Sequence, residues 1–355
     1  MVGRVAVAAL ALVASGCSAP VGESAPAPSP SARTSPTASA EPSPGPSRTP
    51  GAERDRPRDR AARLPPVTGR LSLPALMREE PDGGRPRITA TEYETDAYTR
   101  HQVLYRSGDV DVSGVLLVPK GRGRFPGIVL NHGYIDPAYY VTGQGLAREQ
   151  DALARAGYVV LHTDYRGHAA SAPVRPLERE TRIAYTRDAI NAVAALRRMP
   201  QVDDDRLAML GRSMGGGVTM NALVAQPGLV DAAVLYASVS SRAIENVRHF
   251  TEESRPEAAQ ALYDELGSPQ RAPDVWRGLS ARSYFGRITE PVLTHHGRAD
   301  ATCPPAWATQ TQQAMRAAGV DSELVWYPGE DHAFYARWQQ SMDRTLAFLR
   351  QELRA

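Results

Sequence analysis

Residues Leu207 to Gly217 read LAMLGRSMGGG, an apolar run that ends abruptly in Gly-Arg-Ser-Met-Gly. Such a run is typical of a short buried strand, and the glycines that follow favour a tight turn into a helix. A serine placed two residues from a glycine on either side can be exposed at the tip of that turn. The stretch therefore predicts Ser213 as a nucleophile. Because Gly-x-Ser-x-Gly also occurs by chance, the prediction depends on partners elsewhere in the chain.

From about Ile88 onward, strand-like runs alternate with longer stretches of helical periodicity on both sides of Ser213. The first two predicted strands form an antiparallel pair around the turn Ser107-Gly108-Asp109. The alternation predicts an α/β fold with a mostly parallel central sheet flanked by helices. Besides the run at 207, strands are expected at 98–105, 110–118, 126–131, 158–164, 232–238, 291–297 and 323–328, and helices at 145–156, 181–198, 214–225, 306–318 and 335–353.

Residues 241–288 interrupt this alternation with charged helical segments and no strand. We predict a helical insertion that covers the active site at the carboxyl edge of the sheet. Its aromatic side chains are candidate walls of a substrate pocket, although most of them could equally pack within the insertion. These candidates are Phe250, Tyr263, Trp276, Tyr284 and Phe285.

Polar groups follow several of the predicted strands, and open parallel sheets bind ligands at these carboxyl ends. Acyl transfer by a serine needs a base to take its proton, an acid to orient that base, and amides for the developing oxyanion. Asp300 follows one strand and His332 follows the next. The chain order Ser213, Asp300, His332 is that of the α/β-hydrolase arrangement and differs from the trypsin and subtilisin orders. We predict this trio as the catalytic triad.

The region from about Tyr98 to the C-terminus resembles the α/β-hydrolase superfamily, and within it the prolyl-oligopeptidase-like and dienelactone-hydrolase-like serine hydrolases. The resemblance rests on five strand-end motifs: Asn131-His132-Gly133, Asp164-Tyr165-Arg166-Gly167, Gly211-Arg212-Ser213-Met214-Gly215-Gly216, His296-Gly297-Arg298-Ala299-Asp300 and Gly329-Glu330-Asp331-His332. It implies the fold and the serine mechanism but no particular substrate. It also implies an oxyanion hole formed by the backbone amides of Tyr134 and Met214.

Several other histidines and acids also follow predicted strands. His132, His168, His295 and His296 lie on loops after different strands without metal-ligand spacing, so we predict no metal and no cofactor. In the family, His132 and His296 mostly shape loops.

Two carboxylates and one thiol are the remaining candidates for a catalytic role. Asp164 could replace Asp300 as the acid, but its Asp-Tyr-Arg-Gly setting indicates a structural turn. Asp331 is expected to be a solvated or capping carboxylate. Cys303 is interpreted as a small buried residue rather than a reactive thiol.

The N-terminus has the layout of an export signal: Arg4, the apolar run 5–13, and small residues before Cys17. These features resemble the bacterial lipoprotein signal, which implies that Cys17 becomes the diacylated first mature residue and anchors the protein on the extracytoplasmic side of the membrane. Ordinary cleavage and secretion is the alternative. Residues 18–50 hold nine prolines and eight serines, so we interpret 18–64 as a disordered tether and 65–355 as the hydrolase domain.

The composition of the 355-residue chain excludes some other classes of function. Forty-one basic and 39 acidic residues nearly balance, which gives no indication of nucleic-acid binding. The 42% apolar content suffices for a large core. With only Cys17 and Cys303 present, a lipidated Cys17 leaves no internal disulfide. The sequence specifies no oligomeric state.

These features together predict an exported serine hydrolase that acts through an acyl-enzyme. We favour a carboxylesterase on small to medium esters, because the chain has only a tether where large prolyl-oligopeptidase relatives carry a peptide-filtering propeller. A peptidase that cleaves short peptides is the alternative. A surface protein that keeps the fold but only binds a ligand would place no demand on an intact trio of Ser213, Asp300 and His332.

Overall fold

The computed structural model of the chain describes residues 64–354. A nine-stranded sheet runs through this part in the order β1-β2-β3-β5-β4-β6-β7-β8-β9. The strands are β1 (Arg87–Glu94), β2 (Tyr98–Ser107), β3 (Val110–Pro119), β4 (Phe125–Asn131), β5 (Val159–Thr163), β6 (Val202–Arg212), β7 (Ala232–Tyr236), β8 (Val292–Gly297) and β9 (Ser322–Tyr327). The pairings from β5 through β9 are parallel, and those of β1 with β2, β2 with β3, and β3 with β5 are antiparallel.

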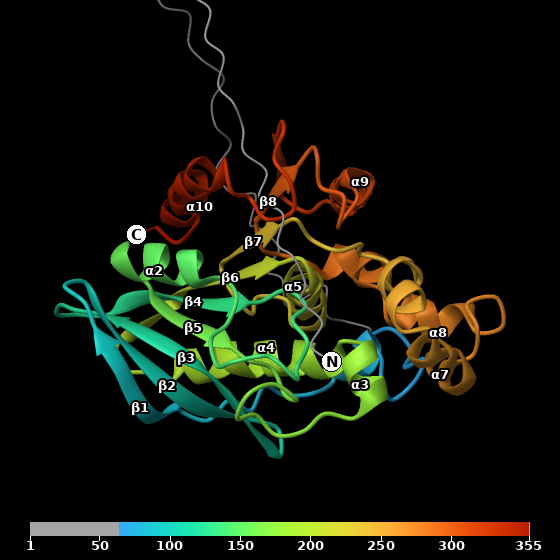
Figure 1. Cartoon of the computed structure of the whole chain (residues 1–355), viewed down its shortest axis with the longest axis horizontal. Coiled ribbons are helices and arrows are strands. Elements are labelled where there is room, and N and C mark those ends of the chain that lie inside the picture. The colour runs from blue at the N-terminus through green and yellow to red at the C-terminus, as the bar shows by residue number, and fades with distance from the viewer. Residues whose placement is uncertain (1–63, 355) are drawn as a thin grey trace, which may run out of the picture. The chain divides into compact units, whose positions relative to one another are not determined.

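Helices cover both faces of the sheet, as Figure 1 shows for α2 and α10 on one side and α4 on the other. The α-helices of the parallel sheet are α2 (Ala147–Arg155), α4 (Ile183–Arg197), α5 (Met214–Ala225), α9 (Pro305–Ala317) and α10 (Trp338–Glu352), and short helices form α1 (Leu73–Leu76) and α3 (Pro176–Glu180). The predicted α/β-hydrolase fold class is therefore confirmed.

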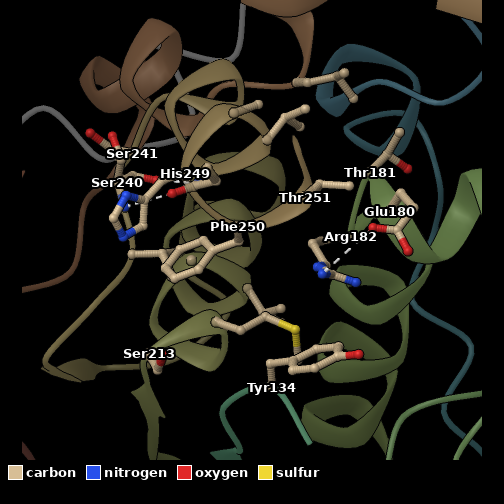
Figure 2. Close-up of a pocket in the computed structure, with 18 of the residues that line it drawn as sticks. Tyr134, Glu180, Thr181, Arg182, Ser213, Ser240, Ser241, His249, Phe250 and Thr251 are labelled. Atoms are coloured by element: carbon tan, nitrogen blue, oxygen red, sulfur yellow. Dashed lines mark hydrogen bonds and ion pairs between the residues drawn. The ribbon is translucent and has the colours of Figure 1, made fainter. Parts of the chain in front are cut away.

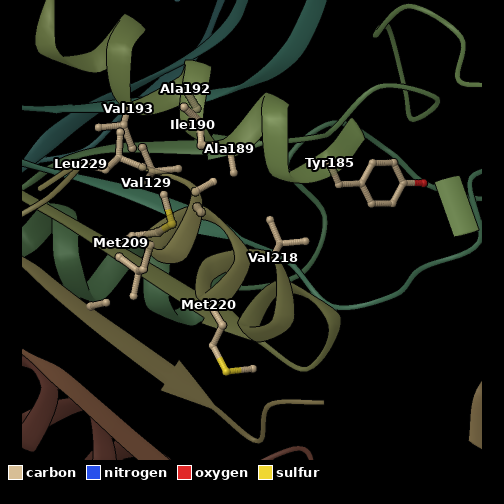
Figure 3. Packing of buried hydrophobic residues seen from close by; sticks show 14 of the residues in the cluster. Val129, Tyr185, Ala189, Ile190, Ala192, Val193, Met209, Val218, Met220 and Leu229 are labelled. Carbon is tan, nitrogen blue, oxygen red and sulfur yellow. The ribbon is translucent and has the colours of Figure 1, made fainter. Parts of the chain in front are cut away.

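The strands of the sheet alternate their side chains between two cores, as period-two geometry requires. In β4, Ile128 and Leu130 are buried in the core beneath α2 and α10, whereas Val129 is buried in the larger core beneath α4 and α5. Figure 3 shows Val129 and Met209 of the sheet close to apolar side chains of these two helices. Two buried faces explain why the central strands read as continuous apolar runs rather than as alternating ones.

The insertion predicted at 241–288 is helical throughout its regular parts. It contains α6 (Ala243–Asn246), the π-helix η2 (Val247–Glu252), α7 (Pro256–Leu266), α8 (Pro273–Gly278) and the 3-10 helix η3 (Ala281–Arg287). In Figure 1 it forms the orange lobe that carries α7 and α8. Its buried side chains, such as Leu262, Trp276 and Phe285, belong to the same core as α4 and α5. The insertion is therefore built into the domain.

The structure adds elements that the sequence did not predict. Residues 64–87 include α1, and Leu73, Leu76 and Met77 are buried in the larger core. This segment therefore supplies part of the interior of the domain. Strand β1 was also missed, because every one of its residues is exposed and no apolar face marks it.

The predicted signal and nearly all of the predicted tether, at residues 1–63, lie outside the described residues. No helix within residues 64–354 combines the length and the apolarity needed to cross a bilayer.

Candidate active site

Ser213 lies at the junction where β6 ends and α5 begins, as its sequence predicted. Its backbone has φ 55° and ψ −121°, a strained conformation for a residue with a side chain. The flanking glycines have another function here: a Cβ on Gly215 would lie 1.9 Å from the carbonyl oxygen of Asn131, and one on Gly211 would lie 2.2 Å from that of Gly215. The glycines allow the helix to approach β4, and the positive φ falls on the serine itself.

Asp300 and His332 are brought together from the loops that follow β8 and β9. Oδ2 of Asp300 accepts a hydrogen bond from Nδ1 of His332 at 2.9 Å, and the Asp300 side chain is fully buried. Oδ1 accepts the backbone amides of Thr302 at 2.9 Å and Cys303 at 2.8 Å, which fix the carboxylate in place. This is the geometry of an acid that selects one tautomer of its histidine, with the Nε2 face left free to accept a proton.

The two loops approach each other because Gly297 has no side chain. A Cβ there would lie 2.2 Å from the carbonyl oxygen of Glu330, and the amide of Ala299 donates to the same oxygen at 2.9 Å. The Glu330 carboxylate accepts hydrogen bonds from the amides of Ala336 and Arg337. These bonds fix the far end of the loop after β9 that carries His332, here called the histidine loop.

Ser213 and His332 line the same cavity, but no hydrogen bond joins them in the described residues. The Ser213 hydroxyl instead lies 4.0 Å from the thiol sulfur of Cys303. Hydrogen bonds between nucleophile and base are often long or misaligned in free enzymes and shorten when substrate binds. Cys303 is buried, and burial raises the pKa of its thiol, so its sulfur stays protonated beside the serine.

Arg212, the residue before the nucleophile, connects β6 to the histidine loop. Its Nη1 donates to the carbonyl oxygen of His332 at 3.4 Å, and its Nη2 donates to the buried carboxylate of Glu149 at 2.5 Å. The guanidinium also lies 5.0 Å from the ring centroid of Tyr236. Sequence reasoning gave Arg212 no role, because neither partner is near it in the chain.

The two residues that the resemblance assigns to the oxyanion hole, Tyr134 and Met214, both line the Ser213 cavity. Met214 is the first residue of α5, so its amide has no acceptor within the helix. The loop after β4 passes close to the nucleophile, because a Cβ on Gly133 would lie 3.2 Å from Cβ of Ser213. Tyr134 follows directly, and its half-exposed side chain lines the cavity.

The other strand-end histidines are buried and neutral. Burial lowers the pKa of His132 and of His295 to about 3. The His132 ring contacts the carbonyl oxygens of Gly133 and Asp164, and His296 Nε2 donates to the carbonyl oxygen of Cys303 at 2.9 Å. These contacts hold loops in place. Within residues 64–354, no three His, Cys, Asp or Glu side chains are grouped to hold a metal ion.

The two alternative carboxylates have structural partners. Asp164 accepts the hydroxyls of Ser113 at 2.6 Å and Tyr140 at 2.7 Å, together with the amide of Gly143 at 2.8 Å, so it fixes a turn as predicted. Asp331 is exposed, as expected for a solvated carboxylate, and accepts the amide of Ala333 at 2.8 Å within a turn.

The cavity above Ser213 has a volume of about 710 Å³. Its floor is formed by the start of α5 and its roof by the insertion; Figure 2 shows Ser213 and Tyr134 at one end and Phe250 between them and the roof. Of the five aromatic residues proposed as walls, Phe250 and Trp276 line the cavity. The other three were wrong for this role: Tyr263 packs against Trp276, Phe285 is buried in the core, and Tyr284 packs on that core.

Sequence reasoning also missed the charged part of the cavity wall, which includes the exposed Glu253. Its buried and partly buried members are Glu180, Arg182 and Arg255. These residues lie at the end of α3, before α4 and before α7. The only local signal was the position of both arginines directly before a helix, a place where basic residues are unfavourable because the helix dipole is positive there.

The sequence model described as the prolyl oligopeptidase family matches residues 145–355, more than half of the chain. The uncharacterized peptidase YtmA of Bacillus subtilis is 23% identical over 247 residues, covering 69% of this chain and 91% of that protein. The uncharacterized peptidase YuxL of the same organism is 27% identical over 242 residues, 65% of this chain but only 35% of YuxL. Dipeptidyl peptidase 4 of Felis catus is 31% identical over 150 residues, which are 41% of this chain and 18% of that enzyme.

Among solved structures, acetyl xylan esterase 1 of Thermoanaerobacterium superposes with a TM-score of 0.61 at 18% identity, covering 78% of this chain and 92% of the esterase. The acylaminoacyl peptidase of Pyrococcus horikoshii superposes with a TM-score of 0.59 at 21% identity, covering 73% of this chain and 42% of the peptidase. These two likenesses show the fold. The family match includes Ser213, Asp300 and His332, and by it the chain belongs to the prolyl oligopeptidase family of serine hydrolases.

Proposed function

We propose that the protein is an exported carboxylesterase that uses Ser213 as nucleophile, His332 as general base and Asp300 as the acid that orients it. The observation that carries the proposal is the 2.9 Å contact between His332 Nδ1 and Asp300 Oδ2, because it leaves Nε2 of a histidine on the wall of the Ser213 cavity as proton acceptor. A histidine that served only to shape its loop would need no buried carboxylate at Nδ1.

The reaction follows from this arrangement in two steps. His332 takes the hydroxyl proton of Ser213 as Oγ attacks the ester carbonyl, and the amides of Tyr134 and Met214 receive the oxyanion. The intermediate collapses, His332 gives the proton to the leaving alkoxide, and the acyl-enzyme remains. Water then attacks the acyl-enzyme with His332 again as base, while Asp300 stabilises the imidazolium.

An ester substrate is supported by the likeness to the acetyl xylan esterase, of which the chain covers 92%. Coverage alone does not separate the two substrate classes, because the chain also covers 91% of the uncharacterized peptidase YtmA. The second candidate is a peptidase on short peptides, which the family match and the likeness to dipeptidyl peptidase 4 favour.

Fluorophosphonate labelling tests the nucleophile. The purified domain should label covalently and Ser213→Ala should not, whereas a Ser240→Ala variant, which alters another serine of the cavity wall, should still label. Equal labelling of wild type and Ser213→Ala would refute the assignment. A turnover screen on 4-nitrophenyl esters of increasing acyl length beside aminoacyl and dipeptidyl anilides then decides between ester and amide; faster turnover of the anilides would establish the peptidase.

We further propose that Cys17 is diacylated and anchors the protein outside the cytoplasmic membrane. The support is the sequence alone: a basic residue, an apolar run and small residues precede the cysteine. Cys17→Ser should block processing or move the protein from the membrane fraction to the medium. Unchanged membrane retention of this variant would refute the anchor and favour another mode of attachment.

A further inference from the structure

Two arginines from different helices meet on one wall of the Ser213 cavity. Arg182 precedes α4 and Arg255 precedes α7, and both line the cavity. Their guanidinium carbons lie 5.9 and 5.4 Å from the ring centroid of Tyr134. Figure 2 shows Arg182 with Glu180 on one side of the cavity and His249 on the other. Both positive charges therefore lie beside Tyr134, whose amide is one of the two assigned to the oxyanion hole.

The arginines share a single buried carboxylate. Glu180 Oε1 accepts Nε of Arg179 at 3.0 Å and Nη1 of Arg255 at 2.5 Å, and Nη2 of Arg182 lies 4.0 Å from Oε2. Burial acts to raise the pKa of Glu180, but the charges of Arg182, Arg255 and Arg179 outweigh it and lower the pKa, so the carboxylate is ionised. Among the residues that line the cavity, Arg182 and Arg255 are balanced in formal charge by Glu180 and the exposed Glu253, so an anion site here depends on which side chains face the cavity with free donors.

The two arginines expose more of their side chains than Glu180 does. The side chains of Arg182 and Arg255 are 21% and 27% exposed, whereas that of Glu180 is 3% exposed. Each guanidinium carries five N–H donors, and one on each has a hydrogen-bond acceptor in the described residues: Arg182 Nη1 donates to the carbonyl oxygen of Arg179 at 2.7 Å, and Arg255 Nη1 to Glu180. Donors remain for a ligand.

On the opposite wall, the polar side chains of Ser241 and His249 already have hydrogen-bond partners within the protein. Ser241 Oγ accepts Nε of Arg282 at 3.0 Å and contacts Thr311 Oγ1 at 3.0 Å. His249 Nε2 donates to the carbonyl oxygen of Thr302 at 3.1 Å. These polar atoms of the opposite wall therefore have protein partners, whereas most N–H donors of the two guanidinium groups have none in the described residues.

The backbone of Arg182 is itself strained. Its φ of 61° lies in the left-handed region, which a residue with a side chain occupies at a cost in free energy. Strain of this kind persists where the surrounding structure requires the side chain in one place, and such positions cluster at functional sites. Here the strained residue is the one that points a charge into the cavity.

The direction of the reaction decides which part of a substrate meets these charges. The leaving group must lie beside His332, which protonates it, and the acyl oxygen must lie beside the amides of Tyr134 and Met214. The acyl chain then extends away from His332, along the part of the cavity that Tyr134 shares with the arginines. On the basis of the proposed hydrolase function, we propose that Arg182 and Arg255 form an anion subsite that selects esters whose acyl group ends in a carboxylate.

Three 4-nitrophenyl esters of equal acyl length test the subsite: the adipate monoester, the hexanoate and the 6-aminohexanoate, which are anionic, neutral and cationic. Wild-type kcat/KM should be roughly 10- to 100-fold higher for the adipate monoester than for the hexanoate, since charge-assisted hydrogen bonds have about that strength. The cationic ester should be the poorest substrate. The preference should fall as salt is raised, because ions screen the arginines.

Variants assign the preference to the wall. Arg255→Gln should reduce the ratio of adipate to hexanoate turnover toward one, mainly through KM, and Arg255→Lys should restore part of it. Arg271→Gln, an exposed arginine of the same insertion outside the cavity, should leave the ratio unchanged. Equal turnover of the three esters by wild type, a preference for the cationic ester, or a ratio that Arg255→Gln leaves intact would overturn the subsite.

Binding to Ser213→Ala separates this proposal from the proposed function. Monomethyl adipate should bind that variant more tightly than methyl hexanoate in calorimetry, and the added Arg255→Gln change should abolish the difference. If wild type hydrolyses no ester but the difference persists, the ester function fails and the subsite stands. If esters are hydrolysed and monomethyl adipate shows no advantage, the subsite fails.

Discussion

Asp300 divides its two carboxylate oxygens between two tasks. One oxygen accepts two backbone amides of its own loop, and the other accepts Nδ1–H of His332. An asparagine could keep the first oxygen in place but would turn an amide NH₂ toward His332. The histidine would then carry its proton on Nε2, the atom that must accept the proton of Ser213.

Asp300→Asn should therefore lower kcat by about 10³- to 10⁴-fold with little change in thermal stability, as expected for a histidine held in the wrong tautomer. The matched control is Asp331→Asn, since that neighbouring carboxylate is exposed and accepts only the amide of Ala333; it should stay within about twofold of wild type. Steady-state kinetics on an activated ester measures both. Comparable losses in the two variants would assign the effect to the loop rather than to the acid.

The placement of Ser213, Asp300 and His332 after strands of one sheet could be predicted because an apolar run precedes each of them in the sequence. The charged part of the cavity wall could not be predicted from the sequence. Arg182, Arg255 and Glu180 come from the ends of three helices, and their charges meet only after α3, α4 and α7 have packed together. The roles of Trp276 and Tyr263 could not be predicted either, because both are aromatic residues of the same insertion. Only their packing places Trp276 on the cavity wall and Tyr263 against Trp276.

At the scale of elements, the approach of α5 to β4 positions the serine. Gly215 lies so close to the end of β4 that a Cβ would be 1.9 Å from the carbonyl oxygen of Asn131 and 2.6 Å from that of His132. Both contacts are to backbone, so no side-chain rotation can relieve them. A methyl group here must push the helix away from the strand and with it move Ser213 from the Gly133 loop.

Gly215→Ala should lower the free energy of unfolding by about 3 kcal/mol or more, at the upper end of overpacking costs, and should abolish turnover. Gly286→Ala provides the control: a Cβ there would meet no heavy atom within 4 Å, so stability should change by less than about 0.5 kcal/mol. Urea unfolding of the two variants measures the difference. A Gly215→Ala enzyme with wild-type stability would contradict the packing described for this junction.

The sequence predicted the central elements well because their signal is local. Apart from β6, strands β2 to β9 and the long helices lie within a few residues of their predicted bounds, since continuous apolar runs mark strands buried on both faces. Strand β6 begins at Val202, ahead of the predicted run at Leu207, because its first half is polar and partly exposed. The edge strand β1 pairs with β2 but exposes every residue, so its sequence carries no such mark. The few apolar residues of α1, Leu73 and Leu76, are too short a pattern to reveal that they enter the core.

Across the whole molecule, buried neutral histidines connect stability to pH. Burial lowers the pKa of His132 and His295 to about 3, whereas in the unfolded chain both take up a proton near pH 6.5. The unfolded state therefore binds more protons between about pH 6.5 and 3, and stability falls as the pH falls through this window. Each histidine contributes about 1.4 kcal/mol per pH unit once the pH is well below 6.5.

The free energy of unfolding should accordingly be lower at pH 5 than at pH 7, by roughly 4 kcal/mol for these two residues together. His295→Gln removes one titrating ring while keeping groups able to bond Tyr327 and Thr345, and it should reduce the difference by roughly 2 kcal/mol. Urea unfolding at the two pH values measures both. Equal stability at pH 5 and pH 7 would show that the histidines become protonated in the folded protein.

The thiol beside the nucleophile gives the domain a built-in reporter. Cys303 is the only cysteine in residues 64–354; it is fully buried, its pKa is raised, and its sulfur lies 4.0 Å from Ser213 Oγ. A thiol reagent can reach it only when the loop before α9 opens, so the rate of its alkylation counts those openings. A ligand that occupies the Ser213 cavity should lower the rate of Cys303 alkylation. The dependence of that rate on ligand concentration then gives the dissociation constant without any chemical turnover.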